Sequence, residues 1–241
     1  GLLMESLGSP KLMVLLWIVA GIIAFCGAIA YGELGAAIPK AGGEYIFLSE
    51  LFHPLLGFLS GWISFIVGFS APVAASAMGF SEYFSRAFPD LFAFANQSGI
   101  FNAINLKKAS SIAIILIFTF IHLGGIEKSA RVQNWLTMLK IVMVVGIIFV
   151  GLMFGKGSLE HFNTPVDYQF TAGSWKSVGL SLMWIMFAYS GWNASTYIGS
   201  EIKNPARNIP NSLLLGTGIV ILLYIGLNVF YVYAIPPENM N

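Results

Sequence analysis

The segment FAYSGWNASTYIGSEIKNPARNIP, which runs from Phe187 to Pro210, lies at the end of an apolar run long enough to cross a lipid bilayer. Its middle reads SGWN (residues 190–193), and these residues weaken a helix. Gly191 permits backbone angles that other residues avoid, while serine and asparagine side chains hydrogen-bond to nearby backbone groups. In lipid, irregular backbone is tolerated only where it is buried in protein or lines a cavity. The segment therefore predicts either a broken helix that forms a polar site or an ordinary helix that uses Ser and Gly for close packing, and Gly191 alone favours the second.

The composition places the whole chain in a membrane. Of its 241 residues, 57% are hydrophobic and 10% are charged, whereas soluble domains carry about 25% charged residues. The net charge of +1 gives no basic surface for nucleic acid. The one cysteine, Cys26, excludes an intrachain disulfide and a cysteine metal cluster. Because the chain opens on Gly1 rather than Met, we expect it to be part of a longer protein.

The apolar runs set the number of membrane spans. A spanning helix needs about 20 mostly apolar residues, and the runs are continuously apolar, as in helices, rather than alternating, as in barrel strands. We therefore predict an all-α polytopic membrane protein, with a short amphipathic helix at the interface over Glu44–His53. Residues 1–241 form one transmembrane domain in this prediction, with six spans at about residues 12–38, 55–84, 106–123, 132–154, 174–200 and 210–235. Lys and Arg divide almost equally between the two sides, so charge does not set the orientation.

Lys140 lies about two turns into its span. A charge at this depth usually faces a cavity or a partner, which suggests a fixed cation inside the helix bundle. A lysine can also extend its aliphatic stem to the nearby interface. The spacing alone leaves both interpretations open.

Enzyme signatures are missing from the chain. It has no HExxH, GxSxG, P-loop or GxGxxG motif, and its spans contain few polar groups. We therefore expect no catalytic residues, no metal and no cofactor. A polytopic membrane enzyme and a non-transporting membrane scaffold remain the alternatives to transport, although a scaffold has no need for a helix weakened at mid-membrane.

Three blocks of the sequence resemble transporters of the amino acid–polyamine–organocation superfamily, and the order and separation of the first and third also match the family. They are YGELGAAIPKAGGEYIFL (Tyr31–Leu48) with GFLSGW (Gly57–Trp62), GIEKSARVQNWLTMLKIV (Gly125–Val142) and FAYSGWNASTYIGSEIKNPARNIPNSL (Phe187–Leu213). The resemblance covers nearly the whole chain and implies a fold of two inverted five-helix repeats with a discontinuous helix. It makes the six spans helices two to seven of that fold, so that the fold in this chain is incomplete.

The resemblance also implies which residues bind the substrate. In the family, the α-amino group of the substrate binds carbonyls of an unwound turn in helix six, and its carboxylate binds the broken helix one, which lies outside this sequence. Relatives carry an aromatic residue that acts as a gate over the substrate, and Phe187 falls at its position. Lys140 matches a lysine that, in sodium-independent relatives, takes the place of a sodium ion. Some relatives have an acidic residue at the position of Asn193. The neutral amide of Asn193 favours neutral substrates. The residues that match the turn are Ala188, Tyr189, Ser190, Gly191, Trp192 and Asn193.

These expectations combine into one functional hypothesis. The protein would be a multi-pass protein of the cell membrane that carries out secondary active transport of amino acids by alternating access, as a proton-coupled symporter or an amino acid exchanger. Its partners would be an amino acid substrate, protons in the symport alternative and the lipid bilayer, with no nucleic acid. Small residues of the third helix, Ser70, Ala71 and Ser76, are candidates for lining the cavity.

Overall fold

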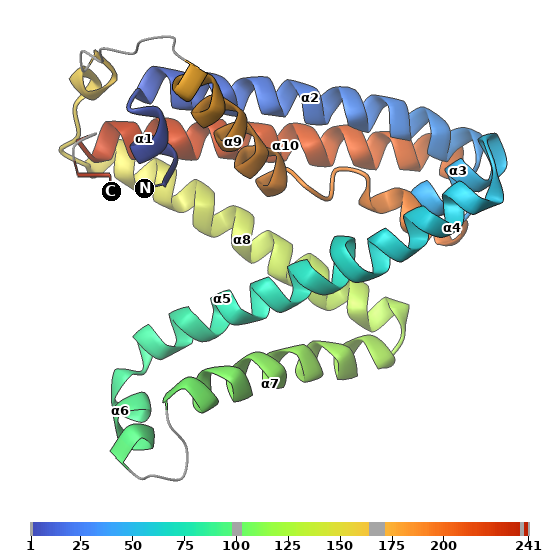
Figure 1. Cartoon of the computed structure of the whole chain (residues 1–241), viewed down its shortest axis with the longest axis horizontal. Helices are drawn as coiled ribbons and strands as arrows, with labels where there is room; N and C mark the ends of the chain where they lie inside the picture. The colour runs from blue at the N-terminus through green and yellow to red at the C-terminus, as the bar shows by residue number, and fades with distance from the viewer. Residues whose placement is uncertain (1, 98–102, 164–171, 237–238, 241) are drawn as a thin grey trace. The chain divides into compact units, whose positions relative to one another are not determined.

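The structure is a computed structural model that describes residues 2–97, 103–163, 172–236 and 239–240. All regular elements in these ranges are helical (Figure 1), which confirms the predicted all-α class. The chain divides into two compact units, residues 1–50 with 140–241, and residues 51–139. The single domain over residues 1–241 stays a prediction.

Within the described ranges, five helical stretches are long and apolar enough to cross a membrane. They are Pro10–Ala37, Pro54–Ala87, Ile104–Leu123, Glu127–Phe154 and Pro205–Ala234, and they match five of the six predicted spans. Large apolar side chains are exposed on them, as the hydrocarbon of a bilayer allows; Leu222, for example, is 73% exposed and Phe154 is 77% exposed. The protein is therefore an integral, multi-pass membrane protein.

The sixth predicted span, residues 174–200, is not one continuous helix. Helix α9 (Ala172–Ala188) ends before the 3-10 helix η3 (Ala194–Glu201), and the turn Tyr189–Asn193 separates them. The sequence alone left open whether the helix is broken at Gly191. The structure answers this question, and the discontinuous helix is confirmed. Whether this region crosses the membrane as the sixth span stays a prediction.

The first unit is built on two long helices, α2 (Pro10–Ala37) and α10 (Pro205–Ala234), which lie side by side in Figure 1. They are antiparallel, because Gly21 of α2 lies against Ile221, whereas Gly35 lies against Ile209. Small residues at the contact let the two backbones approach closely, which is how membrane helices associate without a hydrophobic driving force. A Cβ atom built on Gly35 would lie 2.7 Å from Cγ2 of Ile209.

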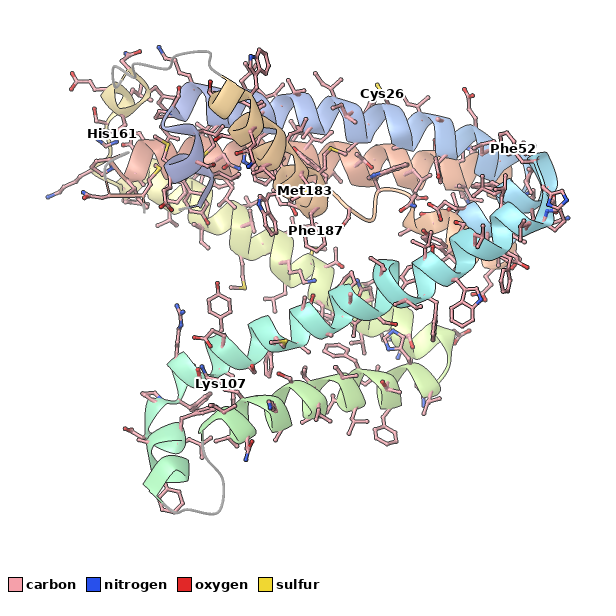
Figure 2. All side chains as sticks on the ribbon, viewed as in Figure 1. Cys26, Phe52, Lys107, His161, Met183 and Phe187 are labelled. Atoms are coloured by element: carbon pink, nitrogen blue, oxygen red, sulfur yellow. The ribbon has the colours of Figure 1, made fainter. Side chains whose placement is uncertain are left out.

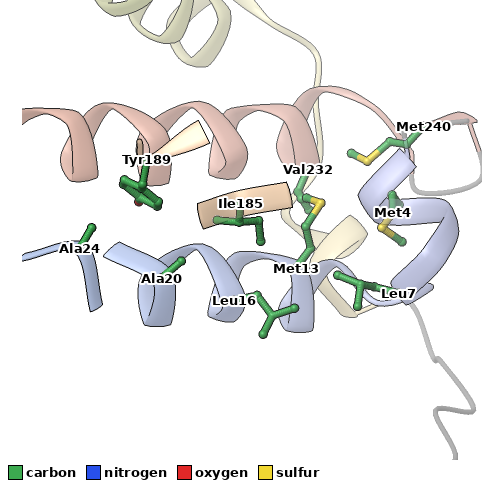
Figure 3. Close-up of a cluster of buried hydrophobic side chains, with 10 residues drawn as sticks. All are labelled: Met4, Leu7, Met13, Leu16, Ala20, Ala24, Ile185, Tyr189, Val232 and Met240. Carbon is green, nitrogen blue, oxygen red and sulfur yellow. The ribbon is translucent and has the colours of Figure 1, made fainter. Parts of the chain in front are cut away.

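Shorter elements complete the first unit: α1 (Leu2–Leu7), α3 (Glu44–Leu51), η2 (Leu159–Asn163), the end of α8 (Ile126–Phe154), α9 and η3. The short helix α3 matches the amphipathic helix predicted at Glu44–His53. Helix α9 packs against α1 and α2. Figure 3 shows the core that these contacts bury, which consists of Met4, Leu7, Met13, Leu16, Ala20, Ala24, Ile185, Tyr189, Val232 and Met240.

The second unit contains α4 (Pro54–Ile63), the π-helix η1 (Ser64–Ser70), α5 (Ala71–Ala87), α6 (Pro89–Gln97), α7 (Ala103–Leu123) and the start of α8. The π-helix precedes Pro72, whose ring excludes a regular α-helical bond on its N-terminal side, and Ser70 Oγ donates to Phe65 O at 2.6 Å. Helices α5 and α7 pack together. Lys107 of α7, labelled in Figure 2, pairs with Glu82 of α5 at 2.6 Å.

The close approach of α2 to α10 predicts the effect of adding one methyl group. We expect Gly35→Ala in the full-length protein to lower its stability by about 1–3 kcal/mol, because overpacking forces neighbouring groups apart. The measurement is thermal unfolding in detergent. Gly216→Ala on α10 is the matched control, because a Cβ atom there meets nothing within 4 Å. An equal Tm for Gly35→Ala and the control would contradict the tight contact.

Candidate functional site

Gly191 creates the turn that follows α9. Its φ angle is 96°, in a region that L-residues with side chains rarely adopt. A Cβ atom at this position would meet nothing within 4 Å. The backbone conformation, and not crowding, therefore requires glycine here.

The main chain of the turn is only partly hydrogen-bonded. Tyr189 N donates to Ile185 O at 3.0 Å, Ser190 N to Phe187 O at 3.1 Å and Ala194 N to Gly191 O at 3.1 Å. In the part of the chain that the structure describes, three carbonyl groups and three N–H groups of the turn make no close, well-aligned hydrogen bond. The carbonyls are those of Tyr189, Ser190 and Trp192, and the N–H groups are those of Gly191, Trp192 and Asn193. Unpaired main-chain groups require a partner wherever water is excluded, so the turn can bind a small polar molecule through its backbone.

Two tyrosines fix the N-terminal end of the turn. Tyr224 of α10 donates from its hydroxyl to Ala188 O at 3.0 Å, and Tyr189 donates to Trp17 O of α2 at 3.2 Å. The three aromatic rings lie against one another, with centroids 5.1 to 5.7 Å apart. Tyr189 is only 3% exposed. Its side chain therefore supports the turn, and its backbone carbonyl is the group left for a ligand.

The C-terminal end of the turn contacts the end of α2 and the start of α3. The ring of Trp192 meets Tyr31 edge to face at 4.9 Å and covers Gly27, where a Cβ atom would lie 2.9 Å from it. Asn193 donates from Nδ2 to Glu44 Oε1 and to Tyr197 Oη. The Trp192 and Asn193 side chains are thus engaged with the protein itself.

Three of the predicted binding residues are exposed. Ser190 and Gly191 are at the outer side of the turn, and the side chain of Phe187 is 58% exposed at the end of α9, where Figure 2 labels it. An exposed aromatic ring one turn before Gly191 has the position required of a lid. The lid role of Phe187 stays a prediction.

The other predicted residues are not brought to the turn by any described contact. Lys140 is exposed on α8 and makes no ion pair within the described ranges. The exposed residues Ser70, Ala71 and Ser76 belong to the unit of residues 51–139, whereas the turn belongs to the other unit. Their roles stay predictions. Among the described residues, no group of three or more His, Cys, Asp or Glu side chains could hold a metal ion.

Sequence reasoning missed three residues that hold the turn: Glu44, Tyr197 and Tyr224. Tyr197 and Tyr224 carried no signal, since tyrosine is common near membrane interfaces. Glu44 stands in the conspicuous stretch GGEY, but a charge at the start of an interfacial helix is ordinarily solvated. Only the structure brings it next to Asn193, 149 residues away in sequence.

Comparison with known proteins agrees with this architecture. A family model described as "Amino acid permease" matches residues 3–241. The chain is 34% identical over 237 residues to b(0,+)-type amino acid transporter 1 of Mus musculus, covering 98% of this chain and 46% of that protein. It is 32% identical over 252 residues to Large neutral amino acids transporter small subunit 2 of Homo sapiens, covering 98% and 43%. The chain thus spans about half the length of the curated relatives it matches. It belongs to the amino acid permease family, within the amino acid–polyamine–organocation superfamily that its motifs resemble.

Proposed function

We propose that the protein is a secondary transporter that carries amino acids across the plasma membrane by alternating access. The observation that carries this proposal is the turn Tyr189–Asn193, whose main chain presents unpaired donors and acceptors at the break between α9 and η3. Broken helices in secondary transporters bind substrates in this way. The relatives, which are named as amino acid transporters, support the same class of substrate.

The chemistry of the turn suits the ammonium group of an amino acid. An ammonium group has three donors and no acceptor, and three carbonyls of the turn, at Tyr189, Ser190 and Trp192, are without a donor among the described residues. Phe187 would cover the bound molecule, and Lys140 would supply a fixed positive charge in place of a coupling ion. The carboxylate of the substrate would bind the broken helix one that the family resemblance implies.

The proposed function is tested by uptake into proteoliposomes that contain the full-length protein. We expect uptake of at least one labelled amino acid from a panel of neutral, cationic and anionic substrates, because the turn recognises the ammonium group common to all of them. An internal amino acid that stimulates uptake would identify exchange, and a proton gradient that stimulates it would identify symport. Lack of uptake for the whole panel, with the protein folded, would contradict the proposal and favour the enzyme or scaffold alternative.

Replacement of Gly191 tests the role of the turn. We expect Gly191→Val to reduce uptake by at least about tenfold, because a β-branched residue is strained at a φ of 96°. The amount of protein in the membrane should change little. Gly179→Val on α9 is the matched control, because a Cβ atom there also meets nothing within 4 Å but the backbone is helical. Equal uptake by both variants would rule out a requirement for the turn.

Replacement of Lys140 tests the fixed-charge role. We expect Lys140→Ala to lower the uptake rate or the apparent substrate affinity, because the fixed positive charge proposed to replace a coupling ion would be lost. The control is Lys128→Ala, which removes an exposed lysine from the first turn of the same helix. Unchanged rate and affinity for Lys140→Ala would show that the charge at this position is not needed for transport.

A further inference from the structure

The Glu44 carboxylate contacts the last residue of the turn and the helix that follows it. Its Oε1 accepts from Asn193 Nδ2, and its Oε2 accepts from the Tyr197 hydroxyl at 2.6 Å. Asn193 Nδ2 also donates to the Tyr197 hydroxyl at 3.2 Å. The three side chains therefore form a closed hydrogen-bonded ring between the start of α3 and the start of η3.

The backbone around Glu44 is built for this contact. Gly42 and Gly43 have φ angles of 132° and 53°, and a Cβ atom on Gly43 would lie 2.6 Å from the Tyr197 ring. Gly42 N donates to Tyr197 O at 3.2 Å, and Gly43 N donates to Thr196 O at 3.3 Å. Two main-chain and two side-chain bonds thus join residues 42–44 to residues 193–197.

Glu44 differs in its partners from the other carboxylate of the same helix. Glu50 pairs with Lys40 at 2.5 Å and is exposed. Glu44 is half-buried, and within the described ranges it makes no ion pair. Hydrogen bonds from neutral donors to a charged carboxylate are stronger than bonds between neutral groups. The carboxylate of Glu44 is therefore satisfied by neutral partners: Asn193, Tyr197 and the hydroxyl of Tyr31 on α2.

We propose that Glu44 is a positioning residue for the substrate turn. Tyr189 and Tyr224 hold the N-terminal end of the turn, and Glu44 holds its C-terminal end through the Asn193 amide. With both ends fixed, the main-chain groups of the turn are held in one arrangement. This reduces the entropy cost of ordering them when a substrate binds. This inference rests on the proposed function, since substrate affinity is one of its two readouts.

Exchanging the two partners is the sharpest test. In the full-length protein, Asn193→Asp places two carboxylates in contact, and like charges repel. We expect this variant to raise the half-saturation concentration for uptake by about tenfold, with a smaller change in maximal rate per molecule. Adding Glu44→Gln should restore affinity to within about threefold of the wild type, because the amide and carboxylate are then present in exchanged places.

The matched control is Glu50→Gln, which neutralises the other carboxylate of α3 and should leave the half-saturation concentration unchanged. Wild-type affinity in Asn193→Asp alone, or a double variant no better than that single variant, would overturn the proposal. If the Asn193→Asp variant does not express, the same contact is tested with Glu44→Ala, Asn193→Ala and the double variant. The combination should be no worse than either single change, whereas additive losses would overturn the contact.

Thermal unfolding of the same variants in detergent separates this inference from the proposed function. We expect Asn193→Asp to lower the Tm and the exchanged pair to recover it, whether or not uptake is seen. A wild-type protein that takes up no amino acid would refute the proposed function alone. A Tm that the second change does not recover would refute the Glu44 contact.

Discussion

The arrangement around the turn depends on one constraint: main-chain groups that an interrupted helix leaves unpaired need a partner wherever water is excluded, as it is in the hydrocarbon of a bilayer. The break at Gly191 exposes such groups over five residues, Tyr189–Asn193. A break of this kind persists only if the surrounding structure holds it. The antiparallel pair α2 and α10 supplies that support, because small residues such as Gly35 let the two helices pack closely against each other.

The support is placed at the two ends of the turn and leaves the middle free. At one end, Tyr224 bonds the last carbonyl of α9, at Ala188, and Tyr189 bonds Trp17. At the other end, Glu44 binds the Asn193 side chain. The aromatic and carboxylate groups thus satisfy the edges of the break while the carbonyls between them face no donor among the described residues. A rigid frame around unpaired groups is the arrangement that binding of a small polar molecule requires.

The helices were predictable because each apolar run exceeds the thickness of a bilayer, and five of them appear close to the predicted bounds. The break at Gly191 was predictable only in part, since Ser and Gly also serve close packing. The contact partners of the turn were not predictable from patterns. Glu44 and Asn193 are 149 residues apart, and nothing in local composition indicates which distant side chain a half-buried amide will meet. The same limit applies to Tyr224, whose hydroxyl reaches Ala188 from 36 residues away.

The contact with Glu44 changes the meaning of the amide at Asn193. The family resemblance implies that a neutral residue at this position favours neutral substrates, because some relatives carry an acidic residue there. In the structure, the amide nitrogen is directed to a carboxylate and to Tyr197, so the negative charge is present one contact away. An aspartate at residue 193 would repel that carboxylate, which makes an amide the side chain that suits both neighbours. The neutrality of Asn193 follows from its partner, and substrate charge must be inferred from the pair rather than from either residue alone.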